Sequence, residues 1–419
     1  MHAQMARRLG VAAVTSAITI TLAACGSSNG TAAGGDTPTG GATPTGATTG
    51  TPTSDWSTAQ SAAAGGGMKA LVAAANAEGK LNVIALSPTW ANYGEILKAF
   101  QKTYPKVHVV SENPGGGSQQ ELDAVEKNKG QATAPDVVDV GTAFAARGAL
   151  AGDFAAYKVA TWDDIPAAQK DAGGLWWADY GGYIAIGCNP KAISVPCPKT
   201  IKALDNPALK GKVALNGDPT QANAALMAVY AAAVANGSTA AQDAAEPSPS
   251  PAKLAGEIQP GIDFFKKLND EGVFNKTSVT PATVATGATP IVLDWDYLQV
   301  ANAQALKSKG LTWQVNDPSD GLVGAFYNQA INATAPHPAA ARLWEEFLMS
   351  HAATGGQNGY LRGFAHPAEL DAMKADHTLD AKAAAMLPPV DAAKAVVPTV
   401  AQVGPANETI VKNWPAAVN

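Results

Sequence analysis

Charged residues, cysteines and long apolar runs are all scarce in this chain of 419 residues. Only 15% of the residues are charged, and the formal charge at pH 7 is −6. This mild acidic excess argues against a nucleic-acid partner, because proteins that bind nucleic acids present basic surfaces. No segment beyond the N-terminal region approaches the about 18 apolar residues of a membrane-spanning helix. A hydrophobic content of 46% is still enough for sizeable folded cores.

Catalytic and metal-binding motifs are missing from the chain after residue 67. This part holds no Gly-x-Ser-x-Gly, no His-Glu-x-x-His and no Walker phosphate loop. The six histidines of the chain are scattered without metal-ligand spacing. We therefore expect a protein that is not an enzyme and that uses neither a metal nor a cofactor. The alternative is a secreted carbohydrate-active hydrolase that uses Asp294 and Asp296, because carboxylates two apart on a strand share a face and paired carboxylates hydrolyse glycosides.

The N-terminal residues have the pattern of a secretory signal. Arg7 and Arg8 precede an apolar run over 11–22, and small residues lead from this run to Cys25. The sequence Leu-Ala-Ala-Cys resembles the lipobox of bacterial lipoproteins, which implies a signal peptide over 1–24 and lipidation of Cys25. We expect an extracytoplasmic protein anchored by lipid to the outer face of the plasma membrane. The arginine pair leaves the general and the twin-arginine export routes both open.

The segment over 25–67 is almost entirely Gly, Ser, Thr, Ala and Pro. Such a composition buries too little apolar surface to offset the entropy of ordering, so a disordered tether is expected there. About 350 residues follow, which is more than one core usually holds, so two lobes are expected. In an oxidising compartment, the two remaining cysteines, Cys188 and Cys197, are expected to form a disulfide rather than a metal site.

Strand and helix patterns alternate through the first part of the body. Apolar runs over 81–86, 107–111 and 135–141 are typical of buried strands, and helical periodicity separates them. Repeated β-α-β order predicts a mostly parallel sheet with helices on both faces, and therefore an α/β fold.

The order of several short segments carries a family resemblance. The chain resembles the extracellular solute-binding proteins of ABC importers, and among them the subgroup of ferric-ion, polyamine, thiamine and aminophosphonate binders. The resemblance implies a two-lobed fold of the periplasmic-binding-protein type (type II), with a ligand cleft between lobes that two crossing strands join. The segments are LNVIAL at 81–86, PDVVDVG at 135–141, DYGGYIAIGCN at 179–189, KGKVALNGDPT at 210–220, DWDY at 294–297 and PAAARLW at 338–344.

The same resemblance implies a division of the chain and a set of partners. Lobe one is expected over 68–182 and 313–419, and lobe two over 183–312. The protein is expected to act as a monomer that captures a small solute and delivers it to a membrane permease driven by a separate ATPase.

Candidate ligand residues lie where strands end, because helix N-termini and loop side chains converge at those points in an open sheet. Trp90 follows the first strand, and its ring could stack on a solute. Ser118, Thr142 and Thr220 stand at expected helix starts, which suit an anionic group. Tyr180 lies at the expected crossing between lobes.

The stretch over 294–297 offers two carboxylates and two aromatic rings after a buried strand. We expect Asp294, Trp295, Asp296 and Tyr297 to form the second lobe's half of the cleft. Carboxylates and rings favour a polyamine-like cation, the helix starts favour an anion, and a zwitterionic amine would use both. Ferric ion is the competing solute, although relatives that bind it have two adjacent tyrosines where only Tyr297 is present here. Replacing Trp295 by alanine is expected to remove solute binding and to leave the unliganded melt nearly intact.

Overall fold

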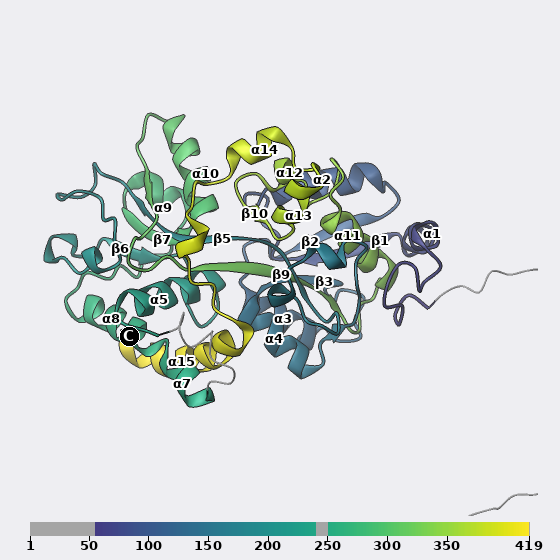
Figure 1. Ribbon diagram of the computed structural model, residues 1–419, viewed down its shortest axis with the longest axis horizontal. Coiled ribbons are helices and arrows are strands. Elements are labelled where there is room, and N and C mark those ends of the chain that lie inside the picture. Colours follow the sequence, from purple (N-terminus) through teal and green to yellow (C-terminus); the bar gives the residue numbers. More distant parts are fainter. Residues whose placement is uncertain (1–54, 240–249, 419) are drawn as a thin grey trace, which may run out of the picture. The chain divides into compact units, whose positions relative to one another are not determined.

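Two long strands run through both halves of the fold (Figure 1). The computed structural model describes residues 55–239 and 250–418, and its central strands are β5 (Trp177–Cys188) and β9 (Gly324–Asn332). The first half of β5 pairs antiparallel with β9, and its second half pairs antiparallel with β7 (Ile291–Trp295). Because β5 belongs to both halves, it joins lobe one, around β9, to lobe two, around β7.

Lobe one contains antiparallel strands of the main sheet and a separate two-stranded parallel sheet. Its strand β3 (Val137–Gly141) pairs antiparallel with β9, whereas β1 (Lys80–Ile84) and β2 (His108–Glu112) are parallel. The prediction of a mostly parallel sheet was wrong, because the long crossing strands run against their neighbours. The other elements of this lobe are α1 (Met68–Glu78), α2 (Tyr93–Thr103), α3 (Ser118–Lys127), α4 (Thr142–Ala151), β4 (Phe154–Ala155), α11 (Pro338–Met349), α12 (Gly359–Arg362), β10 (His366–Pro367), α13 (Leu370–Ala375) and α14 (Ala381–Met386).

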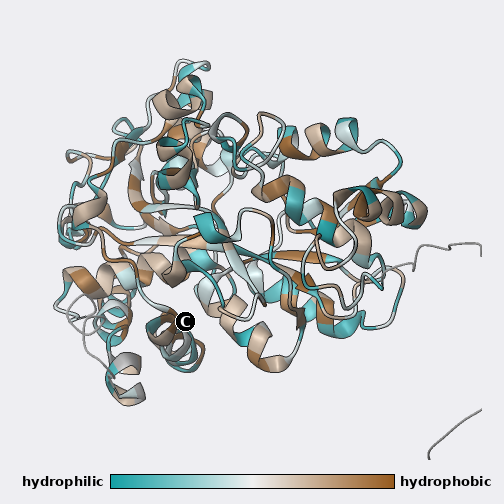
Figure 2. Cartoon of the chain, turned by 45° about the vertical axis from the view of Figure 1, so that its right-hand side comes forward, coloured by the Kyte–Doolittle hydropathy of each residue, from teal (hydrophilic) through white to brown (hydrophobic). Residues whose placement is uncertain are grey.

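Lobe two packs its helices on a smaller group of strands. Helix α5 (Asn223–Ala235) is buried on nearly every side, which suits its alanine-rich, apolar sequence. Figure 2 shows the same division along the whole chain, with brown apolar strands inside and teal residues on the outer helices. The remaining elements are β6 (Val213–Leu215), β8 (Gln314–Asn316), α7 (Pro251–Gly256), α8 (Gln259–Asp270), α9 (Pro281–Thr286) and α10 (Asp296–Lys307). Short 3-10 helices occupy Trp162–Asp164, Ala167–Gln169, Lys202–Leu204, Pro207–Leu209 and Ala392–Lys394.

The end of the expected tether is packed on lobe one. Trp56 is 6% exposed and belongs to the main hydrophobic core. The guanidinium of Arg342, on α11, donates hydrogen bonds to the carbonyls of Ser57 and Ala59 at 3.2 and 2.8 Å. Lobe one therefore includes residues ahead of the expected boundary at residue 68, because one tryptophan gives this otherwise small-residue segment an apolar anchor.

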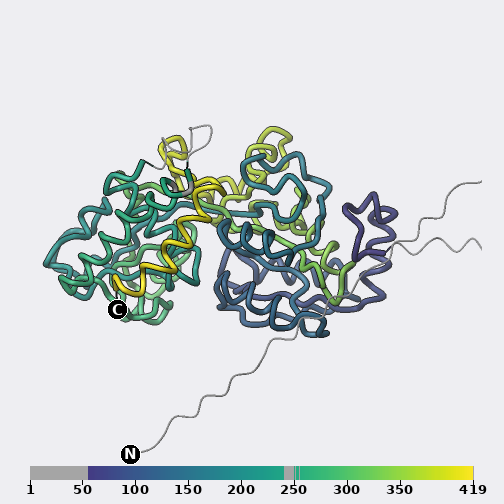
Figure 3. Tube along the Cα trace, turned by 90° about the horizontal axis from the view of Figure 1, so that it is seen from below, coloured from purple at the N-terminus to yellow at the C-terminus, as the bar shows by residue number. Residues whose placement is uncertain are grey.

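The C-terminal helix α15 (Val400–Val418) packs on lobe two and not, as expected, on lobe one alone. It lies along α7 and α8 and also meets α4 (Figure 3). The ring of Trp414 contacts the rings of Phe265 and Phe274 edge to face, with centroids 5.6 and 6.2 Å apart. On the way there the chain passes between the lobes a third time, where Val396 bridges to Val323.

The second half of β5 ends at a disulfide. Cys188, its last residue, is bonded to Cys197 nine residues on, with a Cα–Cα distance of 5.9 Å. This bond closes the loop that leads out of the crossing strand into lobe two. Cys25 lies outside the described residues.

Candidate functional site

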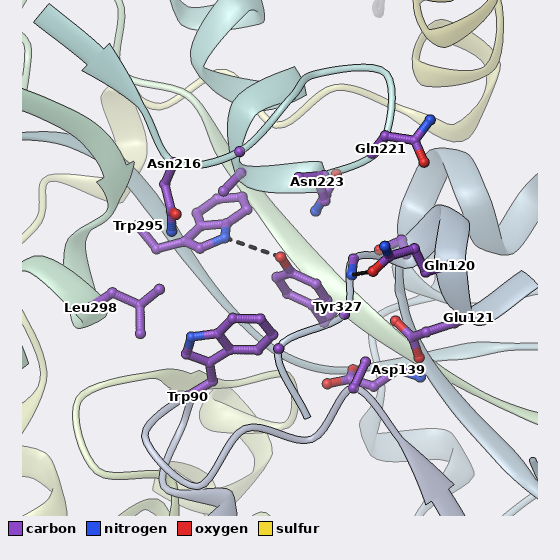
Figure 4. A pocket seen from close by; sticks show the side chains of 18 of the residues that line it. Trp90, Gln120, Glu121, Asp139, Asn216, Gln221, Asn223, Trp295, Leu298 and Tyr327 are labelled. Carbon is purple, nitrogen blue, oxygen red and sulfur yellow. Dashed lines mark hydrogen bonds between the residues drawn. The ribbon is translucent and has the colours of Figure 1, made fainter. Parts of the chain in front are cut away.

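A pocket of about 230 Å³ lies between the two lobes (Figure 4). Lobe one contributes the loop after β1, the N-terminus of α3 and parts of β3, β5 and β9. Lobe two contributes the loop between β6 and α5, the start of α5 and the junction of β7 and α10. The lining residues are Ala85, Trp90, Gly115, Gly116, Gly117, Ser118, Gln120, Glu121, Asp139, Tyr180, Asn216, Gly217, Asp218, Gln221, Ala222, Asn223, Ala224, Trp295, Tyr297, Leu298 and Tyr327.

Five aromatic rings form much of the pocket wall. Tyr180 stacks on Tyr327 with centroids 5.3 Å apart, and Trp295 lies parallel to Tyr297 at 6.3 Å. The indole N–H of Trp295 donates to the hydroxyl of Tyr327 at 3.4 Å, which joins the two stacks across the lobes. Trp90 faces this group from the loop after β1 and is only partly buried (Figure 4). Such a wall excludes water and attracts cations to the ring faces.

The loop that carries Trp90 has a strained backbone. Ala85, Ala91 and Asn92 have φ values of 57°, 39° and 58°, in the left-handed region that non-glycine residues seldom occupy. Such conformations cost about 1–3 kcal/mol each and cluster at ligand sites. The loop thus holds the indole of Trp90 over the pocket at the expense of local stability.

Two buried carboxyl groups face the pocket from lobe one. Glu121 on α3 accepts a hydrogen bond from the backbone N–H of Asp139 on β3 at 2.8 Å. Burial, and then the negative charge of Asp179, raises the pKa of Asp139 to about 8. Burial, and then the charge of Asp139, raises the pKa of Glu121 well above its ordinary value. The lining residues include no lysine or arginine, so the pocket itself supplies no cation to balance these groups.

Hydrogen-bond donors also face the pocket, and in Figure 4 the side chain of Asn223 lies above Glu121 and Asp139. Asn223, the first residue of the 13-residue helix α5, is 2% exposed, and its side-chain nitrogen has no hydrogen-bond partner among the described residues. The N-terminus of the 10-residue helix α3 also opens here, at Gly117 and Ser118. Helix N-termini attract anions, because their first N–H groups lack partners within the helix.

The two lobes touch along one edge of the pocket. The backbone N–H of Gln119, in α3, donates to the carbonyl of Gln221, in the loop before α5, at 3.3 Å. Two glycines permit this approach. A Cβ on Gly117 would lie 2.9 Å from the carbonyl oxygen of Gln221, and a Cβ on Gly141 would lie 2.2 Å from the side chain of Asn223. The structure is therefore a closed form in which α3 and the start of α5 are in contact.

Five of the nine expected ligand residues line this pocket. They are Trp90, Ser118, Tyr180, Trp295 and Tyr297. The hydroxyl of Ser118 already accepts the backbone N–H of Gly141 at 3.1 Å. Its contribution to the wall is therefore the backbone at the start of α3.

The two aspartates of the 294–297 stretch lie beneath the wall and do not line the pocket. Asp294 accepts hydrogen bonds from the side chain of Asn216 at 2.9 Å and from its own neighbour's N–H at 2.8 Å. Asp296 is fully buried and accepts the backbone N–H groups of Tyr183 and Tyr297 at 3.0 and 2.8 Å. Both carboxylates thus fix the backbone where β7 turns into α10 beside β5, and neither is placed as a hydrolase would need it.

The two expected threonines also lie off the pocket. Thr142 donates to the carbonyl of Phe326 at 3.4 Å and accepts the amide of Asn328 at 3.2 Å, beside a separate void of about 20 Å³. The hydroxyl of Thr220 donates to Asp218 at 2.7 Å and faces a second depression on lobe two. In both cases a nearby acceptor holds the hydroxyl.

Several lining residues were not selected from the sequence. Glu121 and Asp139 are the most informative, because a carboxylate within the apolar run of β3 was a visible irregularity. Asn223 gave no such signal, since asparagine at a helix start usually caps the helix. Gln120, Asn216 and Leu298 are further lining residues that were not selected.

Within the described part of the chain, no group of three or more His, Cys, Asp or Glu side chains is arranged to hold a metal ion. In the same residues, every helix is too short or too polar to serve as a membrane span.

Solved structures establish the fold. The periplasmic binding protein AfuA from Actinobacillus pleuropneumoniae, with fructose-6-phosphate bound, is 18% identical, with a TM-score of 0.60 over 81% of this chain and 98% of its own. The periplasmic binding protein P5PA is 16% identical, with a TM-score of 0.62 over 81% and 100%. Iron-bound HitA from Pseudomonas aeruginosa is 20% identical, with a TM-score of 0.55 over 81% and 99%. These likenesses confirm the predicted two-lobed α/β fold.

Sequence comparison gives the family. The curated proteins contain no match to this sequence. The family model described as bacterial extracellular solute-binding protein matches residues 132–395, which include both crossing strands and all of lobe two except α15. The chain therefore belongs to the family of bacterial extracellular solute-binding proteins.

Proposed function

We propose that this protein is the solute-binding component of an ABC importer and that its solute is a small zwitterion with an ammonium and an anionic group. Family membership supports capture of a solute outside the cytoplasm. The observation that carries the choice of solute is the polarity of the pocket. The pocket contains buried carboxyls without a cation, and it also contains an unpartnered amide, that of Asn223, beside helix N-termini. A lipid anchor at Cys25 belongs to the same proposal.

The ammonium group belongs beside Glu121 and Asp139. A buried carboxylate without a counter-charge is costly, so the empty pocket favours its protonated form. An ammonium ion would supply the missing positive charge, and it would also make cation–π contacts with the aromatic wall. The rings of Tyr180 and Tyr327 already lie next to Asp139, since the hydroxyl of Tyr180 donates to that carboxyl at 3.1 Å.

The anionic group belongs against Asn223 at the start of α5. The free amide of Asn223 would donate to it, and the two helix N-termini would stabilise its charge. The pocket volume of about 230 Å³ lies below the about 300 Å³ at which sites for drug-sized ligands begin. The solute is accordingly a compact molecule of amino-acid size.

A polyamine and ferric ion fit this arrangement less well. The second ammonium of a diamine would face N–H donors at Asn223 and α3. Ferric ion needs several anionic oxygen ligands that converge on it, and of the adjacent pair Asp296 and Tyr297 only Tyr297 lines the pocket. Its neighbour Asp296 is bonded to backbone N–H groups and turned away from the pocket.

A matched series of solutes tests the proposal. The melting temperature and the heat of binding are measured with an ω-amino acid, the α,ω-diamine and the dicarboxylate of the same chain length, and with ferric citrate. We expect the amino acid to bind, and at 100 times its Kd to stabilise the protein by about 2.7 kcal/mol. Tighter binding of the diamine, the dicarboxylate or ferric ion would replace the zwitterion as the solute class. Turnover of a glycoside would contradict the proposed function.

Affinity for the amino acid is expected to rise with pH. In the empty pocket Asp139 has a pKa of about 8, and a bound ammonium would lower it, so binding releases a proton. Below the free pKa each pH unit then changes Kd by up to tenfold, and between pH 6 and pH 8 Kd falls by up to about 50-fold. Calorimetry in buffers of different ionisation enthalpy measures the released proton directly. An affinity that is constant from pH 6 to pH 8 would contradict the placement of the ammonium at Asp139.

A further inference from the structure

A hydrogen-bond network leads from the pocket into the core of lobe one. Asp139 accepts the hydroxyl of Tyr180 on one oxygen and the side-chain amide of Gln329 on the other, both at 3.1 Å. The same nitrogen of Gln329 also donates to Asp179 at 3.1 Å. One amide group therefore connects the pocket carboxyl to a second carboxyl that lines no part of the pocket.

Arg362 neutralises the second carboxyl. Its guanidinium forms an ion pair with Asp179, and the side chains of both residues are 0% exposed. Its central carbon lies 5.1 Å from the ring centroid of Tyr93 and 4.8 Å from that of Tyr180. Tyr180 thus contacts the arginine with its ring and Asp139 with its hydroxyl. Arg362 thus lies near both carboxyls, Asp139 and Asp179, and it forms its ion pair with Asp179.

We propose that Asp179 is a positioning residue that holds the positive charge of Arg362. Because Arg362 pairs with Asp179, Asp139 has no cation of the protein as its partner and can pair with the ammonium group of the solute. The inference rests on the proposed function for the identity of the solute. The charge distribution itself is independent of any solute, because the residues that determine it, chiefly Asp139, Asp179 and Arg362, all belong to the protein.

As a consequence, the positive charge of Arg362 can stabilise either carboxylate, Asp179 or Asp139. If Asp179 loses its charge, the carboxyls that remain near Arg362 are Asp139, its neighbour across Gln329, and Glu345 on α11, and the positive charge of Arg362 is then no longer held by Asp179. Asp139 would then ionise at a lower pH, since an opposite charge nearby stabilises the carboxylate. If Arg362 loses its charge instead, Asp179 and Asp139 repel each other without compensation, and Asp139 holds its proton to a higher pH.

Other titratable groups surround Asp139, and all of them stay unchanged in these variants. They contribute to the resting protonation of Asp139 but none of them is a cation. From the elements packed around it they are Glu121 on α3, Tyr93 on α2, Tyr180 on β5, Tyr297 on α10, Tyr327 on β9 and Glu345 on α11.

The test follows Asp139 directly in the empty protein. Aspartate residues are labelled with ¹³C at the carboxyl carbon, and the signal of Asp139 is assigned by its loss in Asp139→Asn. We expect the midpoint of its titration to fall by at least one pH unit in Asp179→Asn and to rise in Arg362→Gln. In the double variant the two effects offset each other and the midpoint stays near that of the wild type. Shifts in the same direction, or no shift in either single variant, would overturn the proposal.

Solute binding supplies the second readout. About one tenth of Asp139 is ionised at pH 7 when its pKa is about 8, so Asp179→Asn is expected to bind the ω-amino acid up to about tenfold more tightly at pH 7. Its affinity should also change less between pH 6 and pH 8 than that of the wild type. Damage to the fold would instead lower affinity at every pH, and near-ultraviolet circular dichroism checks for it. If the wild type binds no amine but the titrations shift as expected, the proposed function fails and the assignment of charge stands.

Discussion

Replacing Gly117 with alanine is expected to prevent capture of the solute while both lobes remain folded. The added Cβ would lie 2.9 Å from the backbone carbonyl oxygen of Gln221, which belongs to the other lobe. Backbone atoms cannot rotate away, so the clash is relieved only if α3 and the loop before α5 move apart. Overpacking of this kind costs about 1–3 kcal/mol, which corresponds to about 5- to 150-fold in Kd.

The matched control is the same substitution two residues earlier. Gly115 lines the same pocket, but a Cβ there would meet nothing within 4 Å. Gly115→Ala is therefore expected to bind as the wild type does. Unliganded Gly117→Ala should lose at most about 1 kcal/mol of stability, because alanine caps a helix less well than glycine. Equal affinities of the two variants would show that the contact between α3 and Gln221 is not part of the solute-bound form.

Most elements of the fold could be predicted because their sequences are locally consistent. The apolar runs at 81–86, 107–111 and 135–141 fall on β1, β2 and β3. The direction of a strand relative to its neighbours could not be predicted from local sequence. Whether β9 runs with or against β3 depends on how the chain returns from lobe two, which is a property of the whole topology. The position of α15 likewise depends on distant partners, the rings of Phe265 and Phe274.

The site was only partly predictable, because position at a strand end does not determine which way a side chain points. Trp295 and Asp296 are adjacent, yet the first lines the pocket and the second is bonded to the backbone of β5. Gly182 allows this, since a Cβ there would lie 2.3 Å from a carboxylate oxygen of Asp296. Asp139 on β3 is instead one of the carboxyl groups that face the pocket. Its role follows from burial beside Glu121, which no local pattern reveals.

The 294–297 stretch therefore contributes rings and not charges to the pocket. Its aspartates hold the backbone, while Trp295 and Tyr297 form the lobe-two part of the aromatic wall. This division also changes the expectation for Trp295. A side chain that serves the wall and the core together cannot be removed without loss of both functions.

Trp295→Ala is now expected to reduce stability and binding together, whereas Trp90→Ala should reduce binding alone. Trp295 is 1% exposed and packs on Tyr297 and Tyr327, so its truncation costs about 3–5 kcal/mol in the free energy of unfolding. Trp90 is partly exposed on its strained loop, so its truncation should leave the unliganded melt nearly unchanged. Loss of its ring face from a bound ammonium is worth about 0.5–2 kcal/mol, which weakens binding by up to about 30-fold.

Denaturant unfolding of the two unliganded variants, followed by titration with the ω-amino acid, separates these roles. Binding by Trp90→Ala that equals the wild type would remove Trp90 from the site and leave its strained loop without a function in capture. An unliganded Trp295→Ala as stable as the wild type would show that the two ring stacks are not part of the core. The two variants thus distinguish a ring that the fold requires from a ring that only solute binding requires. The buried ring of Trp295 stabilises the pocket wall, and the partly exposed indole of Trp90 contacts the bound solute.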